Sequence, residues 1–263
     1  MSILEVFADA KADGRGVLIG CMPAGFPTVE HSIASMVAMA EAGCDVIEVE
    51  LPYSDPVMDG PVIQRASDIA LANGVRTRDT LRIIEAVAGT GAKVVLMTYW
   101  NPVERYGVRR FADAMVEAGG AGLITPDLIP DEADEWVAAS EKHKLSRIFL
   151  VAPSSTDTRI GYTADAASGF IYATAVMGVT GARDAVSSAA PALVERVREH
   201  TDKPIGVGLG VSTGAQAAEV AQYADAVIVG SALVRKLLDA ESLSAGVDAV
   251  RALARELRTG VQR

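Results

Sequence analysis

Four carboxylates stand close together in the segment VIEVELPYSDPVMDG, residues 46–60. Glu48 and Glu50 interrupt a run of aliphatic residues typical of a buried strand, whereas Asp55 and Asp59 follow in a loop punctuated by Pro and Gly. A carboxyl group in an apolar interior resists ionisation, so its pKa rises. A carboxyl with a pKa near neutrality can both donate and accept protons, which is the chemistry of a general acid–base catalyst.

The alternation of side chains along a strand decides which way the glutamates point. Glu48 and Glu50 share one face with Val46, and the aliphatic residues between them share the other face. The wholly apolar face suits packing against helices, so both glutamates are predicted to point to the opposite side. A buried Glu is often only a hydrogen-bonded core residue, and Asp55 and Asp59 are also ordinary turn residues. The position at a strand end favours a site for Glu48, and the residues alone leave the two aspartates open.

Eight β-rich apolar segments alternate with amphipathic helical patterns along the chain. The predicted strands are residues 17–22, 46–51, 93–99, 121–126, 147–152, 169–175, 204–210 and 225–230. Apolar residues at three- and four-residue spacing predict helices between them, as at 28–43, 79–89, 108–119, 131–143, 190–200 and 215–224. Strands that alternate with helices pair in parallel through helical crossovers.

Eight strand–helix units in about 250 residues are typical of a (β/α)₈ barrel. The main alternative is an open doubly wound sheet, which normally has fewer strands and an early Gly-rich nucleotide turn. We therefore predict an α/β fold, a (β/α)₈ TIM barrel that forms a single domain over residues 1–263. An extra N-terminal helix at 4–11 is expected to close the bottom of the barrel, and active sites of such barrels lie at the opposite face.

Composition excludes several classes of partner. The net charge of −10 disfavours nucleic acid and anionic membrane surfaces. The N-terminal residues, with acids in the first dozen positions, predict no signal peptide, and no run of about 18 apolar residues predicts a membrane span. Cys21 and Cys44 have no metal-binding or CxxC spacing, which suits a reducing compartment. We predict a cytoplasmic protein.

The ends of the third to eighth predicted strands contain no Lys, His or Arg. A Schiff-base lysine is therefore not expected, and His31, His143 and His200 fall singly on helical segments, so neither a metal site nor a Ser–His–acid triad is predicted. Gly-rich turns at 177–181, 208–214 and 229–234 predict a phosphate site formed by backbone N–H groups. The buried acids and these turns together predict acid–base chemistry on a phosphorylated metabolite. The residues alone do not distinguish between isomerisation, epimerisation and carbon–carbon cleavage.

The segment EVELPYSDPVMDGPVIQ, residues 48–64, resembles the signature of the tryptophan synthase α subunit family. The resemblance continues in order through MTYWNPVERYG, LITPDLIPDEAD, MGVTGAR, VGLGVST and VGSALV, and so spans the chain. It implies retro-aldol cleavage of indole-3-glycerol phosphate to indole and glyceraldehyde 3-phosphate. Glu48 then corresponds to the acid–base residue, Asp59 to the carboxylate that binds the ring N–H, Tyr172 to a neighbouring tyrosine and Thr180 to a loop threonine that bonds the aspartate.

The same resemblance implies further binding residues and a partner. The expected phosphate contacts are Gly181, Gly210, Gly230 and Ser231. The family's β subunit receives the indole in an α₂β₂ heterotetramer, and the expected contacts with it are Pro52, Ser54, Asp55, Asn101 and Pro102. Pyridoxal phosphate would belong to that β subunit, so no cofactor is expected in this chain.

Two positions depart from the family pattern. Glu50 stands where many members have glycine, and it either raises the pKa of Glu48 or is structural. Cys21 stands where the family often has an aromatic residue against the indole. The alternatives are a stand-alone indole-releasing lyase, a sugar-phosphate isomerase or epimerase of the same fold, and a non-catalytic partner of the β subunit, which an intact Glu48 and Asp59 disfavour.

Overall fold

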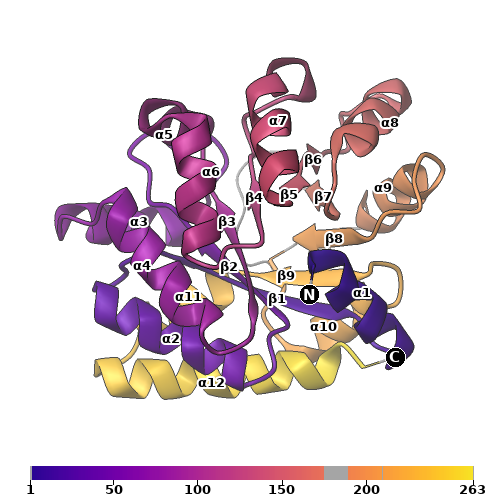
Figure 1. Ribbon diagram of the computed structural model, residues 1–263. Helices are drawn as coiled ribbons and strands as arrows, with labels where there is room; N and C mark the ends of the chain where they lie inside the picture. The colour runs from indigo at the N-terminus through magenta and orange to yellow at the C-terminus, as the bar shows by residue number, and fades with distance from the viewer. Residues whose placement is uncertain (1, 175–188, 209, 263) are drawn as a thin grey trace.

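The computed structural model describes residues 2–174, 189–208 and 210–262, and its centre is a parallel sheet surrounded by helices (Figure 1). The strands are β1 (Val17–Pro23), β2 (Val46–Glu50), β3 (Lys93–Met97), β4 (Gly122–Ile124), β5 (Ser146–Ile148), β6 (Leu150–Val151), β7 (Ile171–Thr174), β8 (Ile205–Gly208) and β9 (Ala226–Val229). Their hydrogen-bonded order is β5-β4-β3-β2-β1-β9-β8-β7-β6. Because β5 and β6 follow one another in the chain with only Phe149 between them, the sheet closes into the predicted (β/α)₈ barrel.

The fifth predicted strand, residues 147–152, is divided into β5 and β6. Ser146–Ile148 pairs with β4, and Leu150–Val151 pairs with β7. The alternation of inward and outward side chains continues through the division, since Ile148 packs inside the barrel and Phe149 packs outside it. The division therefore reflects the stagger between neighbouring strands that barrel closure requires, which leaves each half of the segment opposite a different partner.

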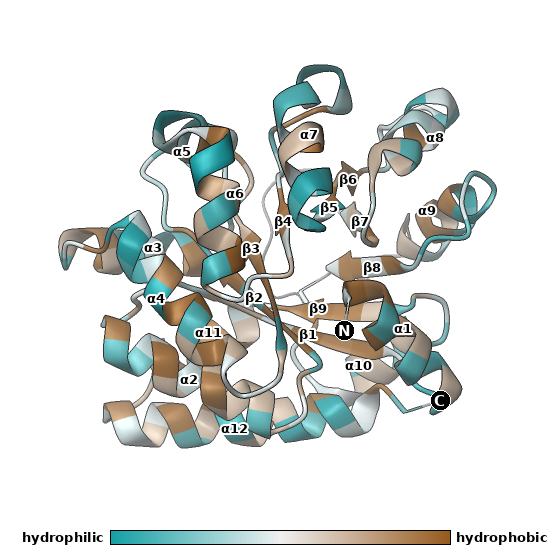
Figure 2. Cartoon of the chain, in the orientation of Figure 1, coloured by the Kyte–Doolittle hydropathy of each residue, from teal (hydrophilic) through white to brown (hydrophobic). Residues whose placement is uncertain are grey.

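The helices surround the sheet, and Figure 2 shows hydrophobic residues along the strands and mixed polar and apolar residues around the helices. They are α1 (Ile3–Ala12), α2 (Val29–Glu41), α3 (Pro61–Ala72), α4 (Thr77–Ala88), α5 (Trp100–Tyr106), α6 (Val108–Glu117), the 3₁₀ turn η1 (Pro130–Glu132), α7 (Asp134–His143), α8 (Asp157–Ala166), α9 (Ala189–Arg198), α10 (Gly214–Ala221), α11 (Ser231–Leu238) and α12 (Leu243–Gly260). The described helices include none with the length and apolar character of a membrane span.

Two groups of buried side chains fill the molecule. One lies between the sheet and the helices and includes Ile47 and Val49 of β2. The other fills the barrel interior and joins Val46 of β2 to Phe7 of α1, whose ring lies 5.5 Å from that of Phe170. The predicted N-terminal helix therefore does pack against one end of the barrel interior. The strand alternation is also confirmed, so Glu48 and Glu50, on the Val46 face, point into the barrel.

Candidate active site

Glu48 is fully buried at the centre of β2. Its parallel neighbour in β1 is Cys21, whose Sγ lies 3.3 Å from Glu48 Oε1. Glu48 Oε2 is buried and has no hydrogen-bond partner. Burial raises the pKa of Glu48 to about 7, although the contact with Cys21 opposes the shift. This carboxyl can therefore hold a proton at neutral pH and still has one oxygen free to deliver it.

Glu50 lies two residues further along the same face, and its Oε1 is 2.6 Å from the Cys21 Sγ. Its Oε2 is also buried without a partner. Burial, and then the nearby Asp59 and Glu48 carboxylates, raises the pKa of Glu50 well above its usual range. The sequence left open whether Glu50 joins the site, and the structure places it beside Glu48 with Cys21 between them.

Asp59 lies in the loop between β2 and α3, and Tyr99, directly beyond β3, fixes its carboxylate. The Tyr99 hydroxyl donates to Asp59 Oδ1 at 2.9 Å and accepts from the backbone N–H groups of Val57 and Met58 at 3.1 and 3.2 Å. Burial raises the pKa of Asp59, and the Tyr99 hydrogen bond partly offsets that shift. Glu50, Asp59 and Tyr99 line one small cavity. Sequence reasoning missed Tyr99, although its phenol at a strand end was a usable signal.

Tyr172 projects from β7 towards the same acids. Burial and then the Glu48 charge raise the pKa of its phenol well above the usual range. A side chain on Gly208 of β8 would put its Cβ 2.7 Å from the Tyr172 hydroxyl. Gly208 is therefore required for Tyr172 to occupy this position, a dependence that the sequence alone did not reveal.

Of the predicted phosphate residues, Gly210, Gly230 and Ser231 lie just beyond the ends of β8 and β9. Gly210 has a positive φ of 72°, which favours glycine. Gly230 and Ser231 begin α11, whose first turn receives no side-chain cap, so its N-terminus can bind an anion. A Cβ on Gly230 would lie 3.4 Å from the Cys21 side chain, which places this turn beside the acids. Thr180 and Gly181 lie outside the described residues.

One group of possible metal ligands occurs in the described part of the chain, formed by Cys21, Glu48 and Glu50. Their thiol and carboxylate atoms lie within 4.8 Å of one another. A tetrahedral metal with thiolate and carboxylate ligands would hold sulfur and oxygen about 3.5 Å apart. The 2.6 Å between Cys21 Sγ and Glu50 Oε1 is too short for that arrangement. The three histidines lie apart on α2, on α7 and in the turn after α9.

The predicted partner contacts lie in the loop after β2 and at the start of α5. Ser54, Asp55 and Asn101 are exposed, Pro102 is half-buried and Pro52 is buried. Asn101 Nδ2 donates to the Tyr53 hydroxyl at 3.1 Å, which joins the loop after β2 to α5. The exposed members are therefore the ones that a partner could contact directly.

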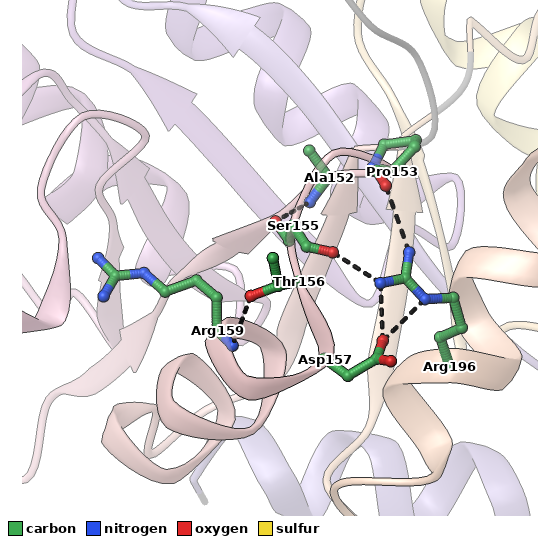
Figure 3. Close-up of polar contacts among 7 residues, drawn as sticks. All are labelled: Ala152, Pro153, Ser155, Thr156, Asp157, Arg159 and Arg196. Carbon is green, nitrogen blue, oxygen red and sulfur yellow. Dashed lines mark hydrogen bonds and ion pairs between the residues drawn. The ribbon is translucent and has the colours of Figure 1, made fainter.

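Arg196 of α9 fixes another loop at the strand ends, between β6 and α8 (Figure 3). Its guanidinium donates to the carbonyls of Ser155 and Pro153 at 2.6 and 3.3 Å and pairs with Asp157 at 2.7 Å. One planar side chain thus ties a βα loop to the helix of the next unit.

A model of the family described as tryptophan synthase alpha chain matches residues 7–262. The chain belongs to this family. The tryptophan synthase alpha chain of Salinispora arenicola (strain CNS-205) is 71% identical over 256 residues, which are 97% of this chain and 96% of that one. The predicted family is confirmed, and with it the prediction of an enzyme of tryptophan biosynthesis.

Solved structures of tryptophan synthase proteins agree with the family assignment. The Mycobacterium tuberculosis tryptophan synthase in space group F222 has a chain that is 57% identical with a TM-score of 0.94, covering 99% of this chain and 98% of that one. Tryptophan synthase subunit alpha from Legionella pneumophila str. Paris is 33% identical with a TM-score of 0.88, covering 99% and 98%.

Proposed function

We propose that this chain cleaves indole-3-glycerol phosphate to indole and glyceraldehyde 3-phosphate, a lyase reaction, as its family membership implies. The observation that carries the proposal is the state of Glu48. Its carboxyl is fully buried, has a pKa of about 7 and keeps one oxygen without a partner. A carboxyl with these properties suits protonation of a carbon atom in a closed apolar site.

The reaction needs one proton delivered and one removed. Protonation of the indole ring at C3 by Glu48 turns the ring into a leaving group. The electrons of the bond between C3 and C3′ then return to the ring, and the C3′ hydroxyl loses its proton as it becomes the aldehyde of glyceraldehyde 3-phosphate. Asp59, oriented by Tyr99, accepts the ring N–H and so stabilises the positive charge that develops there.

The substrate phosphate is assigned to the turns at Gly210 and at Gly230–Ser231. The uncapped N-terminus of α11 offers backbone N–H groups and a favourable helix dipole to this dianion. Thr180 and Gly181 are assigned to loop closure and phosphate binding by the family resemblance alone. Tyr172 is assigned to packing beside Glu48, where its burial among the acids supports that role.

The partner in this proposal is a tryptophan synthase β subunit in an α₂β₂ assembly in the cytoplasm. The exposed side chains of Ser54, Asp55 and Asn101 are available for contact, and Val57, in the same loop as Ser54 and Asp55, is 72% exposed. An exposed aliphatic residue beside polar ones suits a protein interface. Pyridoxal phosphate is assigned to the β subunit, so this chain should need no cofactor of its own.

The test is indole release by the purified chain, measured with and without a cognate β subunit. The native chain should release indole faster when the β subunit is present. Glu48→Gln, which is nearly isosteric, should fold normally and lose at least about 10²-fold in rate. Substantial residual turnover by this variant would refute the assignment of Glu48, and release of no indole by the native complex would refute the proposed function.

A further inference from the structure

Glu50 has no role in the reaction as derived so far, yet it shares a thiol with the acid Glu48. The Cys21 Sγ lies 2.6 Å from Glu50 Oε1 and 3.3 Å from Glu48 Oε1. Each carboxyl therefore has one oxygen in contact with the Cys21 sulfur, and its other oxygen is buried without a hydrogen-bond partner. The thiol thus bridges the two carboxyls, lies closer to Glu50, and leaves one oxygen of each carboxyl without a hydrogen-bond partner.

Strand register produces this arrangement. Cys21 and Glu48 are paired positions of the parallel strands β1 and β2, and Glu50 is the next residue on the same face, opposite Pro23. The small Cys21 side chain leaves room for the Glu50 carboxyl and lies against the turn at Gly230. Glu50 also lines the small cavity that contains Asp59 and Tyr99. It is therefore on the side of the site where the substrate must lie.

Counting protons shows that the two carboxyls cannot act independently. A thiol has a single proton and is a weak donor, so it cannot stabilise two carboxylate charges at once. Both charges in a buried space would repel each other, and the usual result is that such a pair retains one proton between them. Asp59 from the β2–α3 loop adds a further negative charge, with Tyr99 beyond β3 bonded to it, and Tyr172 from β7 contributes a neutral phenol.

We propose that Glu50 is a second catalytic carboxyl, the base that takes the C3′ hydroxyl proton, and that the Cys21 thiol returns this proton to Glu48. This inference rests on the proposed function. The Cys21 thiol has one proton to donate and lies nearer to Glu50 Oε1, at 2.6 Å, than to Glu48 Oε1, at 3.3 Å. In the reactive form the thiol donates to ionised Glu50, against the effect of burial, and Glu48 holds the shared proton. Glu48 gives its proton to indole C3, and the C3′ hydroxyl gives its proton to Glu50 as the carbon–carbon bond breaks.

The site is then reset without any net change in protons. A half-turn of the Glu50 carboxyl brings its new proton to the Cys21 sulfur, and Glu50 passes it there while the thiol passes its own proton to the Glu48 carboxylate. A half-turn of the Glu48 carboxyl then returns the proton to the substrate side. The thiol is neutral before and after, so no thiolate has to form in a place where burial raises the pKa of Cys21. Cys21 acts here as a positioning residue, because it acts only through the two carboxyls.

The experiment compares indole release by Glu50→Gln, Cys21→Ala and Cys21→Ser in the complex with a cognate β subunit. Glu50→Gln should lower kcat by about 10²-fold or more, as loss of a general base does, with a smaller change in KM. Cys21→Ala should also lower kcat, and Cys21→Ser, whose hydroxyl can pass a proton, should be at least tenfold faster than Cys21→Ala. Cys44→Ala and Cys44→Ser form the matched control, since this buried thiol lies outside the barrel interior and its two variants should have equal rates.

The pH profile separates a chemical role from a packing role. The native rate should fall at high pH, where Glu48 loses its proton. Glu50→Gln removes the negative charge that favours protonated Glu48, so the fall should begin at a lower pH. A native kcat and an unmoved profile for Glu50→Gln would overturn the role of Glu50, and equal rates for the two Cys21 variants would overturn the relay. Either result leaves Glu48-dependent cleavage intact, whereas a native complex that releases no indole removes the proposed function itself.

Discussion

The buried carboxyl of Glu48 should make the stability of the folded chain depend on pH. Its pKa is about 7 in the folded state against 4.5 for the free side chain. A carboxyl whose pKa is raised in the folded state makes its full contribution to the free energy of unfolding at pH values below its pKa in the unfolded chain. That contribution is lost as the pH rises through the folded-state pKa. Over the whole window between these two values, ionisation of Glu48 should cost about 3 kcal/mol of the free energy of unfolding.

The measurable part of this effect lies between pH 6 and pH 8. Linkage gives a loss of about 1 kcal/mol from Glu48 over this interval, because the folded chain keeps its proton at pH 6 and has released it at pH 8. Glu48→Gln cannot ionise and lacks this loss. The difference in free energy of unfolding between the variant and the native chain, measured by urea unfolding, should therefore shift by about 1 kcal/mol in favour of the variant as the pH rises.

A matched control is Glu117→Gln, at the exposed end of α6. An exposed glutamate side chain is hydrated to nearly the same extent in the folded and unfolded chain. The difference in free energy of unfolding between Glu117→Gln and the native chain should therefore stay constant over the interval. If Glu48→Gln also differed from the native chain by a constant amount, the carboxyl would not be holding its proton at neutral pH. The acid role of Glu48 would then have no physical basis, whatever the activity of the variant.

Four other changes test individual contacts. Asp59→Asn should lower kcat by about 10²-fold in the indole-release assay, while glyceraldehyde 3-phosphate still inhibits at the native concentration. Tyr99→Phe should lower the free energy of unfolding by about 1–2 kcal/mol and also slow cleavage, because one hydroxyl makes three hydrogen bonds to the Asp59 loop. Gly208→Ala should reduce kcat/KM in the same assay, because its Cβ would displace the Tyr172 hydroxyl, and an unchanged value would contradict the tight contact. Arg196→Lys keeps the charge but loses the planar fork, so urea unfolding should show a loss of about 1 kcal/mol.

The strand pattern predicted the barrel and the inward direction of Glu48, because a period of two depends only on neighbouring residues. It could not predict contacts set by the register between strands. Cys21 and Glu50 stood out separately as departures from the family pattern, and only the pairing of β1 with β2 brings them within 2.6 Å. Tyr99 was missed for the same reason, since the Asp59 loop meets it 40 residues further along the chain. The division of the fifth strand at Phe149 likewise follows from barrel stagger rather than from local sequence.

The way this site would bind phosphate is linked to the way it keeps its acid. A Lys or Arg within about 4–6 Å of a carboxyl lowers its pKa by about 1–3 units. Such a cation would bring Glu48 down from about 7 to a range where it is almost fully ionised at neutral pH. In the described residues, the strand ends around the site offer backbone N–H groups at Gly230 and Ser231 instead, and a helix N-terminus contributes only about half a charge. A phosphate held this way leaves the proton on Glu48, so the lack of basic side chains at the described strand ends favours the acid chemistry.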